Sequence, residues 1–434
     1  MLNFDLKKSK VVDDGLEALC GPLKVTSVGG EVTCLVGIDG GSTSTRVSVI
    51  DADDLDDMEN FMKSYVIPST HSEIISNEVI DPQSEMIIDR MDSVILNEKV
   101  SQDTLFDKVR VLRATKKDDS NKNTIAISSS EQKVDSAAFY INLIDAIGYA
   151  LVQKYTDACP KTFRIKVGAS MRPDDLQGKK NQQKFHDRMV GSYKWVNQDL
   201  GANIQIVIED VAVQSEPEAA LRGNYINSGE ETPSLAVLIE GGGSSFGVEV
   251  LNNGKREGNL SRTFEYGGTQ LKQMIQDRYV EEFGGANLTN DNLELALKEG
   301  IIKRGRNVED ISSIVIDCKN EFSKNILNDV MKEIFDRTTS FKVIDVETFI
   351  FSGRIFRAGD FGEGKGYSLT EPLTKKLVQL NPAAEFITLT ENFIPFGNLV
   401  LAVNNWGEDL LADEDEDEDE EVAVEEAEET DSII

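Results

Sequence analysis

The chain has 434 residues, longer than the roughly 250–300 at which one hydrophobic core usually gives way to several, so we expect at least two domains. Its 40% of hydrophobic residues suffices for such cores. The net charge of −32 argues against a direct electrostatic hold on nucleic acid, which needs clustered Lys and Arg.

The sequence shows no clear targeting segment, membrane span or cluster of metal-binding cysteines and histidines. The N-terminus lacks the apolar core of a signal peptide, and no stretch approaches the ~20 apolar residues that span a bilayer. The 4 cysteines lie far apart, and the 2 histidines cannot form a multi-histidine metal site. We therefore expect a cytoplasmic protein without a membrane partner, in which carboxylates and hydroxyls carry any chemistry.

The first strong pattern in chain order is a hairpin with a glycine turn. Residues 31–38 are apolar and β-branched, and residues 46–50 alternate with period two. The turn between them, Asp39-Gly-Gly-Ser-Thr-Ser-Thr-Arg46, combines an acid, glycines and hydroxyls. Residues 1–30, which precede this hairpin, are interpreted as an added strand or a flexible arm.

A strand followed by a helix is predicted over residues 204–223. The strand alternates, Ser215 and Glu218 have the spacing of a capping box, and Gly223 is a helix stop. This spacing puts Glu216 at the start of the helix. The plain alternative is that Glu216 only favours the helix dipole.

The glycine hairpin occurs a second time at a constant offset of 201 residues, without gaps. Ile239-Glu-Gly-Gly-Gly-Ser-Ser-Phe-Gly-Val-Glu-Val250 aligns with residues 38–49, and apolar strands flank both turns. Such glycines let successive N–H groups converge on an anion. An acid at the head of each turn would repel phosphate unless it holds Mg²⁺ or its waters, since this cation prefers oxygen ligands. For each loop alone, a plain tight turn is the alternative interpretation, but the repetition favours two clamps on one polyphosphate.

Three further elements follow the second hairpin. Gly267 and Gly268 open an amphipathic helix over residues 270–283, residues 346–354 form a strand that ends in a turn, and a helix begins near residue 394. The turn of the second element is either a ligand-binding strand end or a plain turn.

In this order the motifs resemble those of the actin, heat-shock-chaperone and sugar-kinase ATPase superfamily, over about residues 31–406. The resemblance implies an α/β fold of duplicated actin-like (ribonuclease H-like) halves around a nucleotide cleft, with inserted subdomains. It implies binding of ATP or GTP with Mg²⁺, and hydrolysis of the nucleotide. Two departures are Glu240 and Gly247, at positions where the family commonly has Asp.

Site residues follow from that resemblance. Asp39 and Glu240 correspond to the metal-holding acids, and Glu216 to the residue that orients the attacking water, with Gln214 as the alternative. Lys298 and Lys303, with Arg304, fall on a predicted helix where relatives contact base or ribose. The residues expected to bind the nucleotide are Gly40, Gly41, Ser42, Thr43, Ser44, Arg46, Gly241, Gly242, Gly243, Ser244, Ser245, Gly267, Gly268, Lys298, Lys303, Ser352, Gly353 and Arg354.

The predicted domain layout has two halves and two ends. The first half comprises residues 31–214 and 394–408 with an insert at about 52–125, and the second comprises residues 215–393 with an insert at about 285–344. Residues 1–30 are an N-terminal extension. Residues 409–434, with the run Asp413-Glu-Asp-Glu-Asp-Glu-Asp-Glu-Glu421, are expected to be a disordered acidic tail, because like charges repel and bury nothing.

Among members of the superfamily, the pattern is most similar to the ParM-type plasmid- or phage-segregation actins. That resemblance implies a nucleotide-dependent filament of this chain with itself, and a DNA-binding adaptor rather than direct nucleic-acid contact. A small-molecule kinase of the same superfamily, or a chaperone-like ATPase without a peptide-binding domain, is the alternative. Fold alone does not decide between them.

Overall fold

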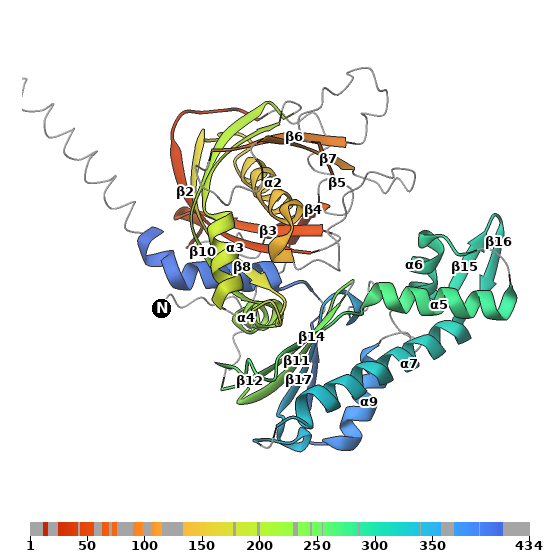
Figure 1. The fold of residues 1–434 in the computed structure, drawn as a ribbon. Coiled ribbons are helices and arrows are strands. Elements are labelled where there is room, and N and C mark those ends of the chain that lie inside the picture. The colour runs from red at the N-terminus through yellow and green to blue at the C-terminus, as the bar shows by residue number, and fades with distance from the viewer. Residues whose placement is uncertain are drawn as a thin grey trace, which may run out of the picture. The chain divides into compact units, whose positions relative to one another are not determined.

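The computed structural model divides the chain into two compact units (Figure 1). One comprises Met1–Ser170, Lys180–Gln214 and Pro395–Ile434, and the other Met171–Lys179 and Ser215–Ile394. The described residues are 12–15, 25–41, 44–55, 63–68, 72–75, 90–98, 106, 108–114, 133–176, 179–197, 200–228, 233–243, 245–253, 255–284, 287–338, 340–356, 369–389 and 391–410. The acidic run from residue 413 lies outside them.

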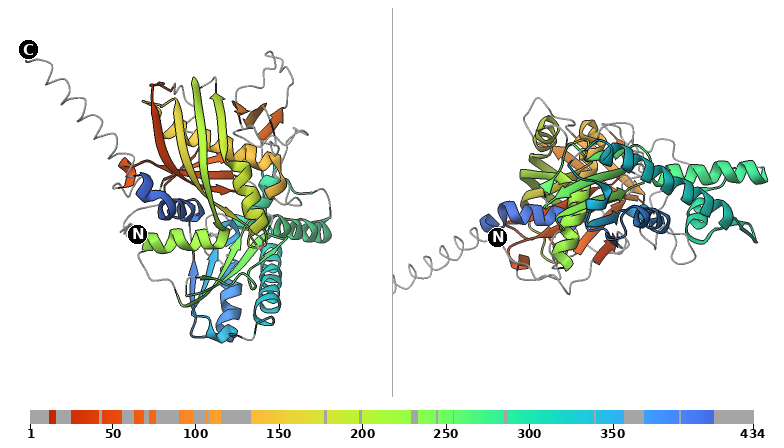
Figure 2. Two further views of the ribbon diagram at one scale, coloured as in Figure 1. Left: turned by 60° about the vertical axis from the view of Figure 1, so that its left-hand side comes forward. Right: turned by 90° about the horizontal axis from the view of Figure 1, so that it is seen from below.

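The described strands of the first unit form one sheet in the order β1-β4-β3-β2-β8-β10-β9-β6-β7-β5. They are β1 (Val12–Gly15), β2 (Glu31–Gly40), β3 (Ser44–Ile50), β4 (Lys63–Pro68), β5 (Ser72–Ile75), β6 (Arg90–Asn97), β7 (Lys108–Ala114), β8 (Thr162–Met171), β9 (Gly191–Asn197) and β10 (Ala202–Ser215). Its helical elements are η2 (Asp53–Leu55), η4 (Lys133–Asp135), α2 (Ala137–Lys154), α3 (Lys179–Met189) and the helical segment 394–410. The views in Figure 2 show the long strands of this sheet beside one another.

Helix α2 lies within the curl of this sheet and is buried along almost its whole length (Figure 1). A helix that is buried all round needs partners on every side. The outer strands β6 and β9 supply them, since Ser93 and Trp195 both bond the buried carboxylate of Asp145. The indole of Trp195 fits against Gly148, where an added Cβ would lie 2.7 Å from the ring. Strand β6, from the predicted insert, and strand β9, from outside it, therefore cover α2.

The second unit has a smaller sheet in the order β13-β12-β11-β17-β18, with β14 paired to β12, and a separate two-stranded ribbon. Its strands are β11 (Leu235–Gly241), β12 (Phe246–Asn252), β13 (Lys255–Arg256), β14 (Arg262–Phe264), β17 (Thr348–Ser352) and β18 (Glu385–Thr388), and the ribbon pairs β15 (Ile301–Arg304) with β16 (Asn307–Asp310). Its helical elements are α4 (Glu216–Ser228), α5 (Gly268–Phe283), α6 (Asn290–Glu299), α7 (Ser312–Val330), η5 (Met331–Phe335), η6 (Val343–Asp345), η7 (Arg354–Phe356) and α9 (Thr370–Leu380).

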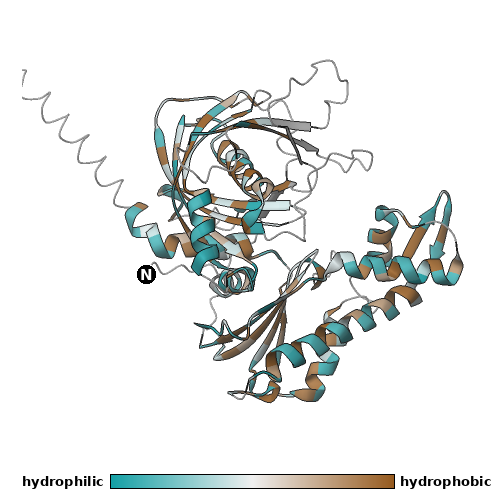
Figure 3. Cartoon of the chain, viewed as in Figure 1, coloured by the Kyte–Doolittle hydropathy of each residue, from teal (hydrophilic) through white to brown (hydrophobic). Residues whose placement is uncertain are grey.

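Helix α7 of the second unit packs through one of its faces. Figure 3 shows apolar and polar residues mixed along α7, and its buried side chains recur at helical spacing. They join a core built with the strands β11, β12 and β17. Because one stripe of the helix is apolar, burying it against the sheet fixes how the helix lies.

The two units repeat one strand arrangement. In the first, β4-β3-β2-β8-β10 are neighbours, and in the second β14-β12-β11-β17-β18 are neighbours. In both, the first strand of the hairpin (β2 or β11) pairs antiparallel with the second and parallel with a later strand. The expected α/β fold of duplicated halves is confirmed.

Several local predictions need correction. The helix that begins at Glu216 runs to Ser228 and does not stop at Gly223, which is buried within it. The helix after the glycine pair begins at Gly268 rather than at residue 270. The N-terminal extension needs no such correction, since it contains strand β1, which pairs parallel with β4 and agrees with the added-strand interpretation. No helix in the described ranges combines the length and apolar character that a membrane crossing requires.

Candidate functional site

The two glycine turns fold as hairpins with the same register. Asp39 pairs with Arg46 across β2 and β3, and Glu240 pairs with Gly247 across β11 and β12, so the offset of 201 residues is kept in the pairing. Both acids are buried, with exposures of 7% and 8%. Each unit thus presents a carboxylate at the carboxyl end of its central strand, which is the edge where α/β sheets bind ligands.

In the first hairpin, glycine is required by close packing. A Cβ on Gly40 would lie 2.7 Å from the Phe139 ring, and one on Gly41 would lie 2.6 Å from the carbonyl oxygen of Ser44. The guanidinium of Arg46 donates to the Ser44 hydroxyl at 3.2 Å. Ser44 and Arg46 are therefore together at this turn, while the expected ligands Ser42 and Thr43 lie outside the described residues.

Lys133 is a cation at this hairpin that sequence reasoning missed. Its ammonium donates to the Gly40 carbonyl at 3.1 Å and lies 5.8 Å from the centre of the Phe139 ring. It comes from η4, 93 residues further along the chain. No local motif marks such a residue, because the contact depends on how η4 and α2 pack beside β2.

The second hairpin is held by the start of α5. The Gly242 N–H donates to Ser245 O at 2.9 Å, and the N–H groups of Gly268 and Thr269 donate to the carbonyls of Gly242 and Gly243 at 3.1 and 2.7 Å. A Cβ on Gly267 would lie 2.7 Å from Gly242 O. The structure therefore brings the expected residues Gly267 and Gly268 to this turn together with Gly241–Gly243 and Ser245; Ser244 lies outside the described residues.

The end of β17 packs against the same turn. Ser352 is buried and pairs with Glu240 in parallel register. Gly353 has φ +89°, and a Cβ there would lie 2.4 Å from the Glu240 carboxylate. Glycine is thus needed both for the backbone conformation and for the close approach. Arg354 turns instead to Glu294 on α6, at 3.4 and 3.5 Å.

The expectation that Lys298 and Lys303 share one helix is wrong. Lys298 lies in the last turn of α6, but Gly300 adopts a left-handed C-cap with φ 70° and ends that helix at Glu299. Lys303, with Arg304, lies on β15, and its backbone is bonded to Asn292. Both lysines are exposed.

Glu216 is the first residue of α4, as predicted, and the residue before it caps the helix. The Ser215 hydroxyl accepts from the Glu218 N–H at 3.1 Å. The same hydroxyl donates to the buried carboxylate of Glu249, which pairs with Arg256 at 2.9 Å. Burial raises the pKa of Glu249 to about 7, against the opposing effects of Ser215 and Arg256. The contacts among Ser215, Glu249 and Arg256 therefore hold the first turn of α4 in place.

Arg172 is a second residue that sequence reasoning missed. Its guanidinium donates to Asp175 at 3.0 Å and to Glu265 at 2.9 Å. Burial opposes its charge, but the bond to Asp175 and the negative charges of Glu265 and Glu216 raise its pKa overall. Arg172 therefore interacts electrostatically with the candidate catalytic carboxylate of Glu216.

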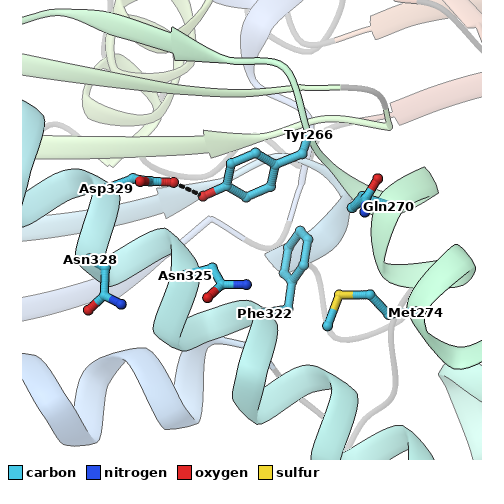
Figure 4. Close-up of a pocket in the computed structure, with 7 residues that line it drawn as sticks. All are labelled: Tyr266, Gln270, Met274, Phe322, Asn325, Asn328 and Asp329. Carbon is cyan, nitrogen blue, oxygen red and sulfur yellow. Dashed lines mark hydrogen bonds between the residues drawn. The ribbon is translucent and has the colours of Figure 1, made fainter. Parts of the chain in front are cut away.

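A cavity of about 500 Å³ opens beside the second hairpin, between the start of α5 and α7 (Figure 4). The Tyr266 hydroxyl donates to Asp329, and its ring packs edge-on against Phe322 and Phe246, with centroids 5.7 and 4.8 Å apart. Amide side chains and one methionine line the rest of the cavity. The seven lining residues are Tyr266, Gln270, Met274, Phe322, Asn325, Asn328 and Asp329.

The donor set suits a magnesium nucleotide. Carboxylate oxygens are the ligands that Mg²⁺ prefers, and it commonly uses one or two carboxylates together with substrate phosphates. The glycine turns leave backbone at positions that a Cβ would fill. Within the described part of the chain, no group of three or more His, Cys, Asp and Glu side chains is arranged to hold a metal by itself.

Known proteins resemble this chain in structure but do not match it in sequence. No protein-family model matches the chain, and no curated protein matches its sequence. Solved structures do match. An archaeal actin homologue, Ta0583, has a TM-score of 0.60 and 14% identity, over 86% of this chain and 99% of that one.

Two further matches are described as a ParM protein and as an Alp12 filament. ParM of Bacillus thuringiensis with AMPPNP has a TM-score of 0.56 and 14% identity, over 86% of this chain and 99% of that one. The Alp12 filament structure has a TM-score of 0.54 and 16% identity, with the same coverage. The chain therefore has an actin-like fold that resembles ParM.

Proposed function

We propose that this chain is a nucleotide-dependent, filament-forming actin-like ATPase. The observation that carries the proposal is the repeated hairpin, because an acid stands at the same register position beside a glycine turn in each unit. Two such turns, on a duplicated actin-like fold, match the need for paired clamps on a charged polyphosphate. The ParM structure with AMPPNP, an ATP analogue, supports a nucleotide ligand.

In this proposal the first turn contributes Asp39, its glycines, Ser42–Ser44 and Arg46, and Lys133 adds positive charge beside Gly40. The second turn contributes Glu240, its glycines, Ser244 and Ser245. Bound Mg²⁺ would neutralise phosphate charge, with Asp39 and Glu240 holding the ion or its waters. Gly267, Gly268 and the segment Ser352–Arg354 would line the nucleoside side, together with Lys298 and Lys303.

Glu216 is proposed to orient the attacking water opposite the leaving phosphate, as carboxylates and amides do in other nucleotide hydrolases. The capping contact of Ser215 fixes the backbone beside it, and the guanidinium of Arg172 interacts electrostatically with the Glu216 carboxylate. These contacts make a defined carboxylate position, which water orientation requires.

The cellular role proposed is segregation of plasmid or phage DNA in the cytoplasm, with the filament reaching DNA through an adaptor. Filament growth would follow nucleotide binding, and disassembly would follow hydrolysis. The Alp12 filament, with the same fold, supports self-assembly. ATP and GTP are both candidate nucleotides.

The test combines light scattering, electron microscopy and phosphate release on the purified chain, with and without ATP or GTP and Mg²⁺. Filaments that appear with nucleotide and shrink as phosphate is released support the proposal. A monomer that transfers phosphate only to a small substrate would identify a kinase and overturn it.

Two substitutions separate binding from hydrolysis. Asp39→Ala should raise the Kd for the magnesium nucleotide by about 10- to 100-fold, because it removes a metal-holding carboxylate.

Glu216→Ala should leave that Kd within a few-fold but lower the rate of phosphate release by about 100-fold. Glu218→Ala, in the same helical turn and paired with Arg222, is the matched control and should hydrolyse normally. Normal hydrolysis by Glu216→Ala would remove its assignment.

A further inference from the structure

Asn398 joins the carboxyl ends of three strands in the first unit. It lies on the helical segment 394–410 and is fully buried. Its amide nitrogen donates to the Ile38 carbonyl at 2.7 Å and to the Ser170 hydroxyl at 3.0 Å, while its amide oxygen accepts from Gln214 at 3.0 Å. Through these bonds one side chain connects the ends of β2, β8 and β10.

The amide orientations are fixed by chemistry. A backbone carbonyl can only accept, so the Asn398 nitrogen must face Ile38 O and its oxygen must face Gln214. The Gln214 nitrogen also donates to the Gly397 carbonyl at 2.8 Å. Both Gln214 N–H groups are thereby used, and the Gln214 amide cannot be flipped without placing its oxygen against two acceptors.

The amide oxygen of Gln214 takes no part in the bonds to Asn398 and Gly397, which use only the amide nitrogen. Gln214 is 4% exposed, and its Oε1 is buried with no hydrogen-bond partner among the described residues. A buried acceptor without a partner is unfavourable, so such an atom is normally met by a donor from water or a ligand. Gln214 lies two residues before Glu216, the candidate catalytic residue. Asn398, which bonds Gln214, also bonds the carbonyl of Ile38, the residue before the candidate metal ligand Asp39.

The helix that carries Asn398 is seated directly on the sheet. Gly37 and Gly168 are paired across β2 and β8. A Cβ on Gly37 would lie 2.2 Å from Pro395 O, and one on Gly168 would lie 1.9 Å from Asn398 O. This glycine pair fixes the depth of the helix, and so the position from which Asn398 reaches the strand ends.

We propose that Asn398 is a positioning residue for hydrolysis, which holds the Gln214 amide so that its oxygen accepts a hydrogen bond from the attacking water. Gln214 then acts beside Glu216, and Asn398 acts only through Gln214. The inference rests on the proposed ATPase function and adds to it a residue 184 positions away from Gln214 in the chain.

The experiment measures nucleotide Kd by fluorescent-nucleotide titration and kcat by phosphate release, for the full chain and four variants. Asn398→Ala and Gln214→Ala should each lower kcat by about 100-fold, since misplacement of about 1 Å can cost that much, with Kd changed less than threefold. The double variant should be no slower than either single variant, because both remove the same water contact.

Asn381→Ala is the matched control. Asn381 is also buried, and its amide donates to the carbonyls of Val343 and Val346 at 2.9 and 2.8 Å, in the second unit. It should lose stability as Asn398→Ala does, yet keep the wild-type kcat well below its melting temperature. If Asn398→Ala does not fold, Gln214→Glu removes the two hydrogen bonds that Gln214 donates to Gly397 and Asn398 without changing the helix, and should lower kcat likewise.

Each outcome has a distinct meaning. If the wild type hydrolyses and Asn398→Ala matches the control, or if the double variant falls by the product of the two single effects, the positioning role is overturned. If the wild type binds nucleotide but releases no phosphate, the inference is likewise overturned. Failure of the wild type to bind any nucleotide instead overturns the proposed function itself.

Discussion

Lys319 is the buried side chain in α7 whose charge state is most altered by its surroundings. Its ammonium is almost fully buried and donates to the Leu297 carbonyl at 2.9 Å, at the end of α6. Burial lowers the pKa of Lys319 from 10.5 to about 7. The residue therefore binds a proton less readily in the folded chain than in the unfolded one.

This difference predicts a pH dependence of stability. Between the folded pKa of about 7 and the unfolded value of 10.5, the unfolded chain binds more protons, so the free energy of unfolding contributed by Lys319 rises with pH across that window. Lys319→Met should remove this rise and make the chain more stable near pH 7, by roughly 1–4 kcal/mol. Urea unfolding at pH 7 and pH 9 measures both effects.

Lys324→Met, on the exposed face of the same helix, is the control and should leave the pH dependence as in the wild type. A Lys319→Met chain whose stability still rises in parallel with the wild type from pH 7 to pH 9 would contradict the assignment of that rise to Lys319.

At the scale of elements, the segment 394–410 depends on two glycines on neighbouring strands. Helix backbone approaches Gly37 and Gly168 so closely that no side chain fits between them. Elsewhere in this unit, α2 depends on Gly148 and Asp145 to accept the indole of Trp195. Close contacts at these glycines decide which helix packs on which strand, since close-packed interiors tolerate little added volume.

Gly168→Ala should therefore destabilise the chain by about 1–3 kcal/mol or more, because its Cβ meets backbone that cannot rotate away. Thermal or urea unfolding measures the loss. Gly29→Ala is the control, since a Cβ there meets nothing within 4 Å and the residue has no positive φ. Equal stability of the two variants would show that the helix is not seated as described.

At the scale of the whole molecule, charge is unevenly distributed along the sequence. Almost half of the net charge of −32 comes from the acidic residues after residue 410. If chains assemble as proposed, these segments are brought to a high local concentration and repel one another. That repulsion fades over a Debye length of ~8 Å at physiological salt.

Truncation after residue 410 should lower the concentration needed for nucleotide-dependent assembly, and should make assembly less sensitive to salt. Sedimentation of polymer at low and high KCl, for the full and the shortened chain, measures both. A control that replaces the acids of 413–421 by Gln keeps the length and should behave like the truncation. Assembly that is lost on truncation would instead indicate that the acidic segment contributes an attractive contact.

The features that the sequence determined by itself are local ones, formed by neighbouring residues, or ones that occur twice in the chain. The two hairpins, their acids at Asp39 and Glu240, the cap at Ser215 and the order of motifs were all readable, because turn chemistry and strand periodicity are properties of neighbouring residues. The resemblance of these motifs to the actin superfamily predicted the duplicated actin-like fold, and the solved structures that match confirm it.

Tertiary structure alone decided the contacts between distant segments. The sequence does not show that β6 and β9 extend the sheet over α2, that Lys133 reaches Gly40, or that Asn398 bonds Ile38 across 360 residues. It also misplaced Lys303, because Gly300 ends α6 before it. Each of these depends on which surfaces pack together, and that choice is made by shape and hydrogen bonding between elements rather than by the pattern within any one of them.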